Sequence, residues 1–385
     1  MAFLLIAVAC GGPATTAVHS SPSSSATSSP SASQSPSPSS SPRPTGLLFA
    51  VLETHPRPGS APNYAANDTV AIVGLDGYAR SKQGFDARNV PSLCGAELLP
   101  QPEARVAAGK VFYIDASGVV RSLDPSGAFT TVTTFARDSQ QLVDFAVDPG
   151  GTQLLAARLT VPVMTSSTGG FPCQQQGFAV DLYSASAGGH PQLGYHQAYA
   201  QESNTDNFIS AVGWDPAGAE ITVHTNIGTQ NGTLGQKWYG QLAHWTPQGV
   251  GSVVGGSDCR AQDAVGNSIA CISNQGEGAG SVRGPDASIQ WNLPSSIYYF
   301  IRLSPDASKA AYCNSSECGV AGRDGTHLKL PAHFNPTGWL DASTVIGVDQ
   351  ELSPYGEMET VSLSDPTKVD DLGFKGLFVG VVQAS

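Results

Sequence analysis

Charged residues are scarce in this chain, and basic residues are scarcer than acidic ones. Lys and Arg together number 19 against 31 Asp and Glu among 385 residues, so the formal net charge is −12 and the isoelectric point is near 5.0. A nucleic-acid-binding protein needs a basic face, and the basic residues here are spread along the whole chain. The sequence therefore predicts no nucleic-acid partner.

Long apolar runs and the common catalytic motifs are also missing. No stretch reaches the roughly eighteen apolar residues of a spanning helix, so we expect no transmembrane helix. The chain contains no G-x-S-x-G, Walker, G-x-G-x-x-G or H-E-x-x-H pattern. From these absences we predict no catalytic residue, no cofactor and no metal site.

An apolar segment near the N-terminus ends in small residues and a cysteine. Residues 1–10 read MAFLLIAVAC, and two glycines follow. The end of this segment, Ala7-Val8-Ala9-Cys10, resembles the lipobox of bacterial lipoproteins, in which the Cys is lipidated and becomes the first mature residue. The resemblance implies a signal segment over 1–10, lipidation at Cys10 and a membrane-anchored protein at the bacterial cell surface, outside the cytoplasm.

Two features of this segment depart from the lipoprotein pattern. Leu is usual three places before the Cys, where this chain has Ala7, and secretory signals begin with Lys or Arg, which are absent before Cys10. A translation start upstream of Met1 is therefore an open alternative. A short buried apolar strand with an incidental Cys is the other interpretation of the segment.

A low-complexity stretch follows the cysteine. Residues 11–44 contain 14 Ser and 7 Pro, and Arg43 is their only charged residue. Such a composition cannot bury enough apolar surface to offset its ordering entropy, and its prolines favour an extended chain. We therefore predict a disordered Ser/Pro-rich linker over 11–45, which would tether a globular domain over 46–385 to the membrane.

Short strand-like segments fill the remainder of the chain, and none of it has the 3.6-residue period of an amphipathic helix. The segments are rich in Val, Ile, Phe, Tyr and Thr and are separated by Gly, Pro, Asp and Asn, which predicts an all-β domain. They are Leu47–Glu53, Thr69–Leu75, Lys110–Ile114, Gln153–Leu159, Glu220–Thr225, Ser268–Ile272, Tyr298–Leu303, Val345–Val348 and Gly376–Val382.

A four-residue frame recurs before several of these strands. Asp148-Pro-Gly-Gly, Asp215-Pro-Ala-Gly, Asp263-Ala-Val-Gly and Ser304-Pro-Asp-Ala share it, at a base period of about 40–48 residues. Asp caps such a β-turn, Pro fixes φ at its second place and Gly allows positive φ at its fourth. We interpret Asp115, Asp124, Asp148, Asp215 and Asp324 as turn formers, with Ca²⁺ binding as the alternative.

The frame after an apolar strand resembles the TolB-like, WD-related propeller repeats of bacterial exported proteins. Ser304-Pro-Asp-Ala after Phe300–Leu303 carries the resemblance, which covers about 46–385. It implies a single β-propeller of seven blades, with six longer blades or two β-sandwiches as alternatives. We expect Gly376–Val382 to join Leu47–Glu53 in one blade and close the ring, because an open ring would expose sheet edges.

Six cysteines remain besides Cys10, and an even number in an exported chain favours three disulfides over zinc ligation. Turn positions predict the pairing. Cys259 and Cys271 are centred on the Asp263-Ala-Val-Gly266 turn, and Cys313 and Cys318 flank a four-residue loop, so the members of each pair should face each other across a hairpin. Cys94 and Cys173 then pair by exclusion.

Long segments between strands are the expected place for function, since loops on a rigid scaffold usually carry binding. They hold aromatic residues predicted to face a ligand, namely Tyr64, Phe171, Trp238, Tyr239, Trp291 and Tyr355. Packing of Trp214, Trp245 and Trp339 between blades is the structural alternative for the aromatic content. The sequence predicts a binding or scaffolding module for a protein, peptide or glycan. The alternative is a propeller hydrolase or lyase for a sugar or lactone, for which Asp144, Asp263 and Arg302 are the candidate residues.

Overall fold

Every regular element of the described residues is a β-strand. The computed structural model describes residues 46–56, 65–87, 104–162, 177–198, 208–224, 240–246, 249–273, 279–294, 298–349 and 356–383. Within these ranges no helix is long and apolar enough to cross a membrane. The signal segment 1–10 with Cys10 and the linker 11–45 lie outside the described residues.

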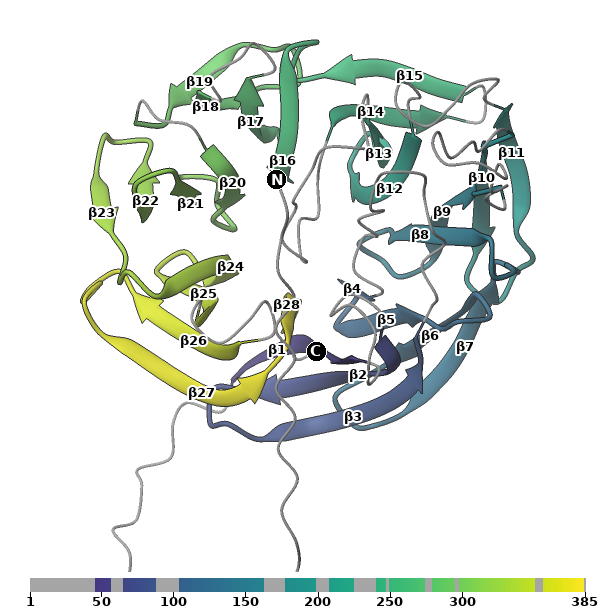
Figure 1. The fold of residues 1–385 in the computed structure, drawn as a ribbon, viewed down its shortest axis with the longest axis horizontal. Helices are drawn as coiled ribbons and strands as arrows, with labels where there is room; N and C mark the ends of the chain where they lie inside the picture. Colours follow the sequence, from purple (N-terminus) through teal and green to yellow (C-terminus); the bar gives the residue numbers. More distant parts are fainter. Residues whose placement is uncertain are drawn as a thin grey trace, which may run out of the picture. The chain divides into compact units, whose positions relative to one another are not determined.

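Seven antiparallel four-stranded sheets surround a central axis as the blades of a propeller (Figure 1). From the innermost strand outward, blade 1 is β28 (Leu377–Gln383), β1 (Leu47–Pro56), β2 (Ala65–Gly74) and β3 (Ala79–Asp86); blade 2 is β4 (Ala104–Ala107), β5 (Lys110–Ile114), β6 (Val119–Leu123) and β7 (Phe129–Thr134); blade 3 is β8 (Gln141–Val147), β9 (Gln153–Thr160), β10 (Ala179–Ser186) and β11 (Gln192–Ala198); blade 4 is β12 (Phe208–Asp215), β13 (Gly218–His224), β14 (Gln241–Thr246) and β15 (Gly249–Val254).

The same order continues through the last three blades. Blade 5 is β16 (Cys259–Val265), β17 (Ser268–Ser273), β18 (Gly280–Arg283) and β19 (Ile289–Asn292); blade 6 is β20 (Tyr298–Leu303), β21 (Lys309–Asn314), β22 (Cys318–Gly322) and β23 (His327–Lys329); blade 7 is β24 (Phe334–Asp341), β25 (Thr344–Asp349), β26 (Glu357–Ser362) and β27 (Val369–Lys375). The all-β prediction and the seven-blade prediction are confirmed, and the six-blade and two-sandwich alternatives are wrong.

The two ends of the propeller domain meet in blade 1. The C-terminal strand β28 pairs antiparallel with β1, with Phe49 opposite Val381 and Leu47 opposite Gln383. β1 in turn pairs with β2 along nearly its whole length. The predicted closure of the ring by its last strand is therefore confirmed, and the blade that closes it draws on both ends of the domain.

The antiparallel order gives the ring two distinct ends. We call the end that carries the connections between first and second strands, and between third and fourth strands, the turn face. The crossover face carries the connections between second and third strands and from blade to blade. The repeated frame joins first and second strands, as Asp148–Gly151 does between β8 and β9 and Ser304–Ala307 does between β20 and β21. The frame is thus a turn-face element, and the predicted turns are present at 148–151 and 304–307.

The fourth place of this frame adopts the left-handed conformation. Gly151 has φ of +70°, and a Cβ there would lie 3.1 Å from the Cβ of Ala108 and 3.2 Å from the ring of Phe112. Glycine is needed because an L side chain would meet both strain and a close contact. Ala307 occupies the same place with φ of +53°, so blade 6 accepts a strained alanine there.

Apolar side chains fill the space between neighbouring sheets. Successive side chains of a strand point to opposite faces of its sheet, so each sheet presents one face to each of its two neighbouring blades. Both faces are covered. Val70 and Ile72 of blade 1, for example, pack with Tyr113 and Leu123 of blade 2. Burial of each such side chain stabilises the fold by about 1.5–3 kcal/mol, so the core is a ring of interfaces between blades.

Two disulfides close hairpins in blades 5 and 6. Cys313 and Cys318 lie directly opposite each other with a Cα–Cα distance of 4.0 Å, as predicted. Cys259 is bonded to Cys271 at a Cα–Cα distance of 5.0 Å, which confirms that pairing. Their predicted register is wrong, because a β-bulge in β16 shifts the ladder and places Cys271 opposite Ala261. Cys94 and Cys173 lie outside the described residues.

Candidate functional site

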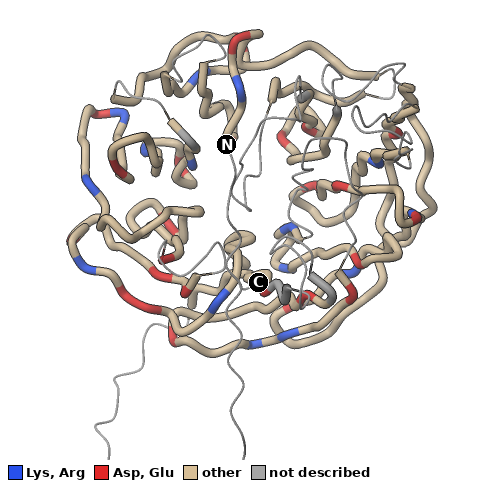
Figure 2. Tube along the Cα trace, in the orientation of Figure 1, with Lys and Arg blue, Asp and Glu red and all other residues tan. Residues whose placement is uncertain are grey.

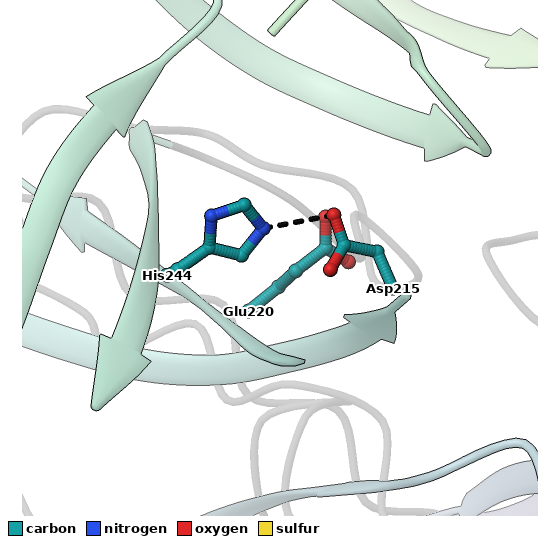
Figure 3. Close-up of side chains that lie close together, drawn as sticks. All are labelled: Asp215, Glu220 and His244. Atoms are coloured by element: carbon teal, nitrogen blue, oxygen red, sulfur yellow. Dashed lines mark hydrogen bonds and ion pairs between the residues drawn. The ribbon is translucent and has the colours of Figure 1, made fainter. Parts of the chain in front are cut away.

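Three side chains with metal-ligating atoms meet at the turn-face end of blade 4 (Figure 3). Asp215 is the last residue of β12, Glu220 lies near the start of β13, and His244 lies in β14. One carboxylate oxygen from each acid and one imidazole nitrogen all lie within 4.8 Å of one another. The three innermost strands of one blade therefore contribute one donor each to the cluster.

Strand register explains why these three residues meet. Glu220 pairs with His244 across β13 and β14, so their side chains project from the same face of the sheet. On the other side Glu220 pairs with Gly213 of β12, which has no side chain to fill the space. Asp215 lies two residues beyond Gly213 on the same face of β12, and its carboxylate reaches the vacant position.

Hydrogen bonds fix the orientation of Asp215. Its Oδ1 accepts from the backbone N–H of Ala217 at 2.7 Å and of Gly218 at 2.9 Å, which is the side-chain cap of the repeated turn. Its other oxygen, Oδ2, lies 2.8 Å from Nε2 of His244. The turn frame that predicted a β-turn here thus also aims one carboxylate oxygen at the histidine.

The cluster lies on the side of blade 4 that faces blade 5. Leu242, two residues before His244 and on the same face of β14, packs against the Cys259–Cys271 pair of blade 5. Glu220 is buried, with 5% of its surface exposed, while the side chains of Asp215 and His244 are 18% and 22% exposed. A buried carboxylate thus lies beneath two partly exposed groups that solutes can reach.

A pocket opens on the opposite, crossover face between blades 1, 2 and 3. It has a volume of about 380 Å³, within the ~300–1,000 Å³ of small-molecule sites. Its lining comes from the end of β3, the turn between β5 and β6 and the connection from β7 to β8. The lining residues are mostly polar and are Asp86, Asp115, Ala116, Ser117, Arg137, Asp138 and Ser139.

Asp115 organises the wall of this pocket. Its Oδ1 accepts from the backbone N–H and the hydroxyl of Ser117 at 2.9 and 2.7 Å, and its Oδ2 pairs with Arg121. Burial acts to raise the pKa of Asp115, but the hydrogen bonds from Ser117, Arg121 and Val119 outweigh it and lower that pKa. Arg137 donates to the backbone carbonyl of Asp115 at 2.9 Å, so a fixed anion and a guanidinium face the same space.

Two of the residues suggested for a hydrolase or lyase, Asp263 and Arg302, join neighbouring inner strands. Asp263 Oδ2 accepts from the backbone N–H of Leu303 at 2.9 Å, and Arg302 donates to the carbonyl of Gln262 at 2.9 Å. Both bonds join β16 to β20. Burial lowers the pKa of the Arg302 guanidinium. Asp144 lies on the innermost strand of blade 3, β8, whereas Asp263 and Arg302 lie on the innermost strands of blades 5 and 6.

The prediction that Trp291 faces a ligand requires correction. Trp291 lies on β19 and is 8% exposed, because its ring packs in the apolar cluster between blades 5 and 6. Trp339 is buried as well, and its Nε1 donates to the carbonyl of Arg302 at 3.0 Å. The other residues predicted to face a ligand lie outside the described residues and are Tyr64, Phe171, Trp238, Tyr239 and Tyr355.

Sequence reasoning found one member of the blade 4 cluster and missed two. The repeated frame singled out Asp215 as a turn former. Glu220 and His244 are 24 residues apart, and their meeting depends on a strand register that the long segment between β13 and β14 conceals. The available signal was a carboxylate just after an Asp-Pro-x-Gly turn, on the face opposite the apolar residues Ala219 and Ile221.

The fold has many relatives of known structure, although no protein-family model and no curated protein matches the sequence. The uncomplexed acylaminoacyl peptidase of Pyrococcus horikoshii is 12% identical with a TM-score of 0.50, over 84% of this chain and 52% of that chain. This chain therefore spans about half the length of that peptidase. An oligogalacturonate lyase in complex with manganese is 9% identical, with a TM-score of 0.44 over 82% and 96%.

A putative TolB from Agrobacterium tumefaciens is 13% identical, with a TM-score of 0.36 over 89% of this chain and all of that chain. The structural neighbours thus include TolB-like and other β-propellers, and at these identities the likeness concerns the fold alone.

Proposed function

We propose that this chain is a lipid-anchored protein outside the cytoplasm whose propeller binds a ligand at the crossover face. Two observations support the compartment. The segment Ala7-Val8-Ala9-Cys10 resembles the lipobox, and the hairpins of blades 5 and 6 carry disulfides, which persist in oxidising compartments.

The pocket between blades 1, 2 and 3 is the observation that carries the binding function. Its carboxylates and serine hydroxyls accept hydrogen bonds and Arg137 donates them, which suits a ligand with many hydroxyl groups. Asp138 is exposed and uses Oδ1 to accept from the backbone N–H of Gln140 at 2.8 Å. A glycan fits this chemistry better than an apolar peptide, and the closed ring supplies a rigid support.

Cell fractionation tests the anchor. The gene is expressed in a bacterial host with its native upstream region, as wild type and as Cys10→Ser. We expect wild type in the membrane fraction and Cys10→Ser in the soluble extracytoplasmic fraction, because the thiol that carries the lipid is missing. Identical fractionation of the two proteins into the soluble pool would contradict the anchor.

A glycan panel followed by calorimetry tests the binding function. The full chain is screened against soluble oligosaccharides, and the tightest ligand is titrated into wild type, Asp138→Asn and Asp324→Asn. Asp324 is a matched control, since its Oδ1 likewise accepts from a backbone N–H two residues on, at 3.0 Å to Thr326, but it lies on the turn face. We expect Asp138→Asn to weaken binding about tenfold and Asp324→Asn to leave it unchanged; equal affinities, or no binding by wild type, would refute the proposal.

A second candidate function, a hydrolase or lyase for a sugar or lactone, is favoured by the meeting of Asp215, Glu220 and His244. Two carboxylates and an imidazole can exchange protons with a substrate at their exposed side. Turnover of a panel of lactones and glycosides by wild type, abolished in Glu220→Gln, would favour this function over binding alone.

A further inference from the structure

We infer that Asp215, Glu220 and His244 form a binding site for one first-row divalent transition-metal cation, for which zinc is the test ion. The site lies on the turn face of blade 4 and is separate from the crossover-face pocket, so the inference does not depend on the proposed ligand. It departs from the expectation of no metal site in the sequence, which rested on missing motifs and not on geometry.

The distances are close to those of ligands on a shared ion. Zinc lies about 2.0–2.2 Å from nitrogen and carboxylate oxygen ligands, so two ligands on one ion are separated by roughly 3–4.4 Å. The three donor atoms lie within 4.8 Å of one another, and His244 Nε2 lies 2.8 Å from Asp215 Oδ2. Side-chain movements of an ångström or less, within the reach of one rotamer well, would bring all three onto one cation.

The chemistry of the donors selects the class of ion. One imidazole and two carboxylates suit zinc, manganese or iron, whereas calcium and magnesium prefer oxygen alone. A divalent cation would neutralise the charge of both carboxylates together. Glu220 is buried, with 5% of its surface exposed. Because repulsion between charges is stronger away from water, neutralisation there yields a larger gain in free energy.

The ligands are held in place by their own hydrogen bonds and strands. Asp215 Oδ1 accepts hydrogen bonds from the backbone N–H groups of Ala217 and Gly218. Metal-binding carboxylates are usually hydrogen-bonded in this way through their second oxygen. In blade 4 the β12–β13 ladder has a β-bulge at Val212, and the β14–β15 ladder has an irregularity in which two residues of β15 lie opposite His244. Bulges re-aim side chains next to functional sites, and here both lie beside the cluster.

A similar pair in blade 3 shows what a purely structural arrangement looks like. His196 Nδ1 lies 2.6 Å from Asp181 Oδ1, and Arg158 lies 2.8 Å from the other oxygen of Asp181. There a guanidinium balances the carboxylate that meets the histidine. In blade 4 the third group is a second carboxylate, Glu220, which adds negative charge and one more donor to the cluster.

An ion at this site would join the three innermost strands of blade 4 at their turn-face ends. β12, β13 and β14 each supply one ligand, so bound metal would oppose separation of these strands. Since the metal binds the folded site and the unfolded chain lacks it, the melting temperature should rise with metal concentration.

Zinc titration of the full chain tests the inference. The oxidised protein is treated with chelator, its free thiols are alkylated, and zinc is added to wild type, His244→Ala, Glu220→Gln and the control His196→Ala. Calorimetry and thermal melting are the measurements. We expect one site per chain in wild type and His196→Ala, at least about tenfold weaker binding in the two site variants, and a zinc-dependent rise in melting temperature only where the site is intact.

Equal zinc affinity and equal melting shifts in all four proteins would overturn the inference, as would no zinc binding by wild type.

A measurement on wild type alone guards against variants that fail to fold. Diethyl pyrocarbonate modifies accessible imidazole nitrogens, and peptide mapping locates the modified residues. Zinc should protect His244 and leave His196 reactive; equal modification of His244 with and without zinc would count against the site.

Discussion

The turn face and the crossover face of the propeller are built from residues at very different distances along the chain. On the turn face an Asp or Ser caps a turn within five residues of itself, as Asp148 does for Gln153 at 2.7 Å. On the crossover face the pocket is lined by Asp86 of blade 1, Asp115 of blade 2 and Asp138 of the connection from blade 2 to blade 3. Local turn chemistry therefore shapes the frame turns of the turn face, whereas the crossover-face pocket also needs residues from more than one blade.

This difference suggests a division of roles. Turn-face residues set the geometry of each blade, so changes there should alter stability. Crossover-face residues meet only after the blades have assembled, so changes there should alter binding more than stability. In a view down the axis, the acidic and basic residues are distributed around the described ring (Figure 2).

The largest expected effect comes from removing the strand that closes the ring. Deletion of residues 374–385 removes β28, which pairs with β1 and buries Leu377 and Val382 against blades 1 and 2. We expect loss of the cooperative unfolding transition, because blade 1 then lacks its innermost strand and the ring is no longer closed. Calorimetry measures it, and a truncated chain that melts like the full chain would contradict the closed ring.

Removal of either disulfide should have a smaller effect on the free energy of unfolding, and the size of the effect should differ between the two bonds. In the chain-entropy model the 12-residue separation of Cys259 and Cys271 stabilises the fold by about 3 kcal/mol, and the 5-residue separation of Cys313 and Cys318 by about 2 kcal/mol. Urea unfolding of the paired Cys→Ser variants should show that order. Reduced wild-type protein is the control for the loss of both bonds, and unchanged stability of either double variant would show that its bond contributes nothing.

A glycine substitution sharpens the account of the turn face. Gly151→Ala should lower the free energy of unfolding by about 2 kcal/mol, because the left-handed backbone costs roughly 1–2 kcal/mol and the new Cβ would crowd Ala108 and Phe112. Gly127 is the matched control, with φ of +89° and nothing within 4 Å of an added Cβ. Gly127→Ala should cost about 1 kcal/mol, and an equal loss in both variants would rule out the contact.

The smallest effect concerns acid stability of the blade 6 turn. Hydrogen bonds from Ser304 and Ser308 lower the pKa of Asp306 to about 2, against 3.8 ordinarily. A lowered folded-state pKa contributes stability that is present above about pH 4 and is lost as pH falls toward 2. Asp306→Asn should therefore be less stable than wild type at pH 6 and should approach it near pH 2. A constant difference between the two proteins across this range would contradict the assignment.

Sequence reasoning succeeded where structure depends on neighbours in the chain. The Asp-Pro-x-Gly frames located the turns, their period gave the blades, and the hairpin positions of Cys313 and Cys318 gave a disulfide. It failed where a bulge or a distant partner decides the outcome. The bulge in β16 shifted the register of Cys271, and Trp291 on an outer strand is covered by blade 6, which no local pattern of that strand reveals.

The candidate sites were harder to predict for the same reason. Asp115 and Asp215 were identified as turn formers, and both turns exist. The further role of Asp115 depends on Asp138 in the connection from β7 to β8, and that of Asp215 depends on His244, two strands away in the sheet. Composition and turn chemistry contain no information on either meeting, since both require the relative placement of strands more than 20 residues apart.

Hydrogen–deuterium exchange of the glycan complex tests most directly the claim that function lies on the crossover face. The full chain is compared with and without the tightest oligosaccharide of the panel, and exchange is mapped by peptide. We predict protection of residues 115–117 and 137–139, which line the pocket, with unchanged exchange in the blade 6 turn at 304–309. Protection at 304–309 with none at the pocket would contradict the account.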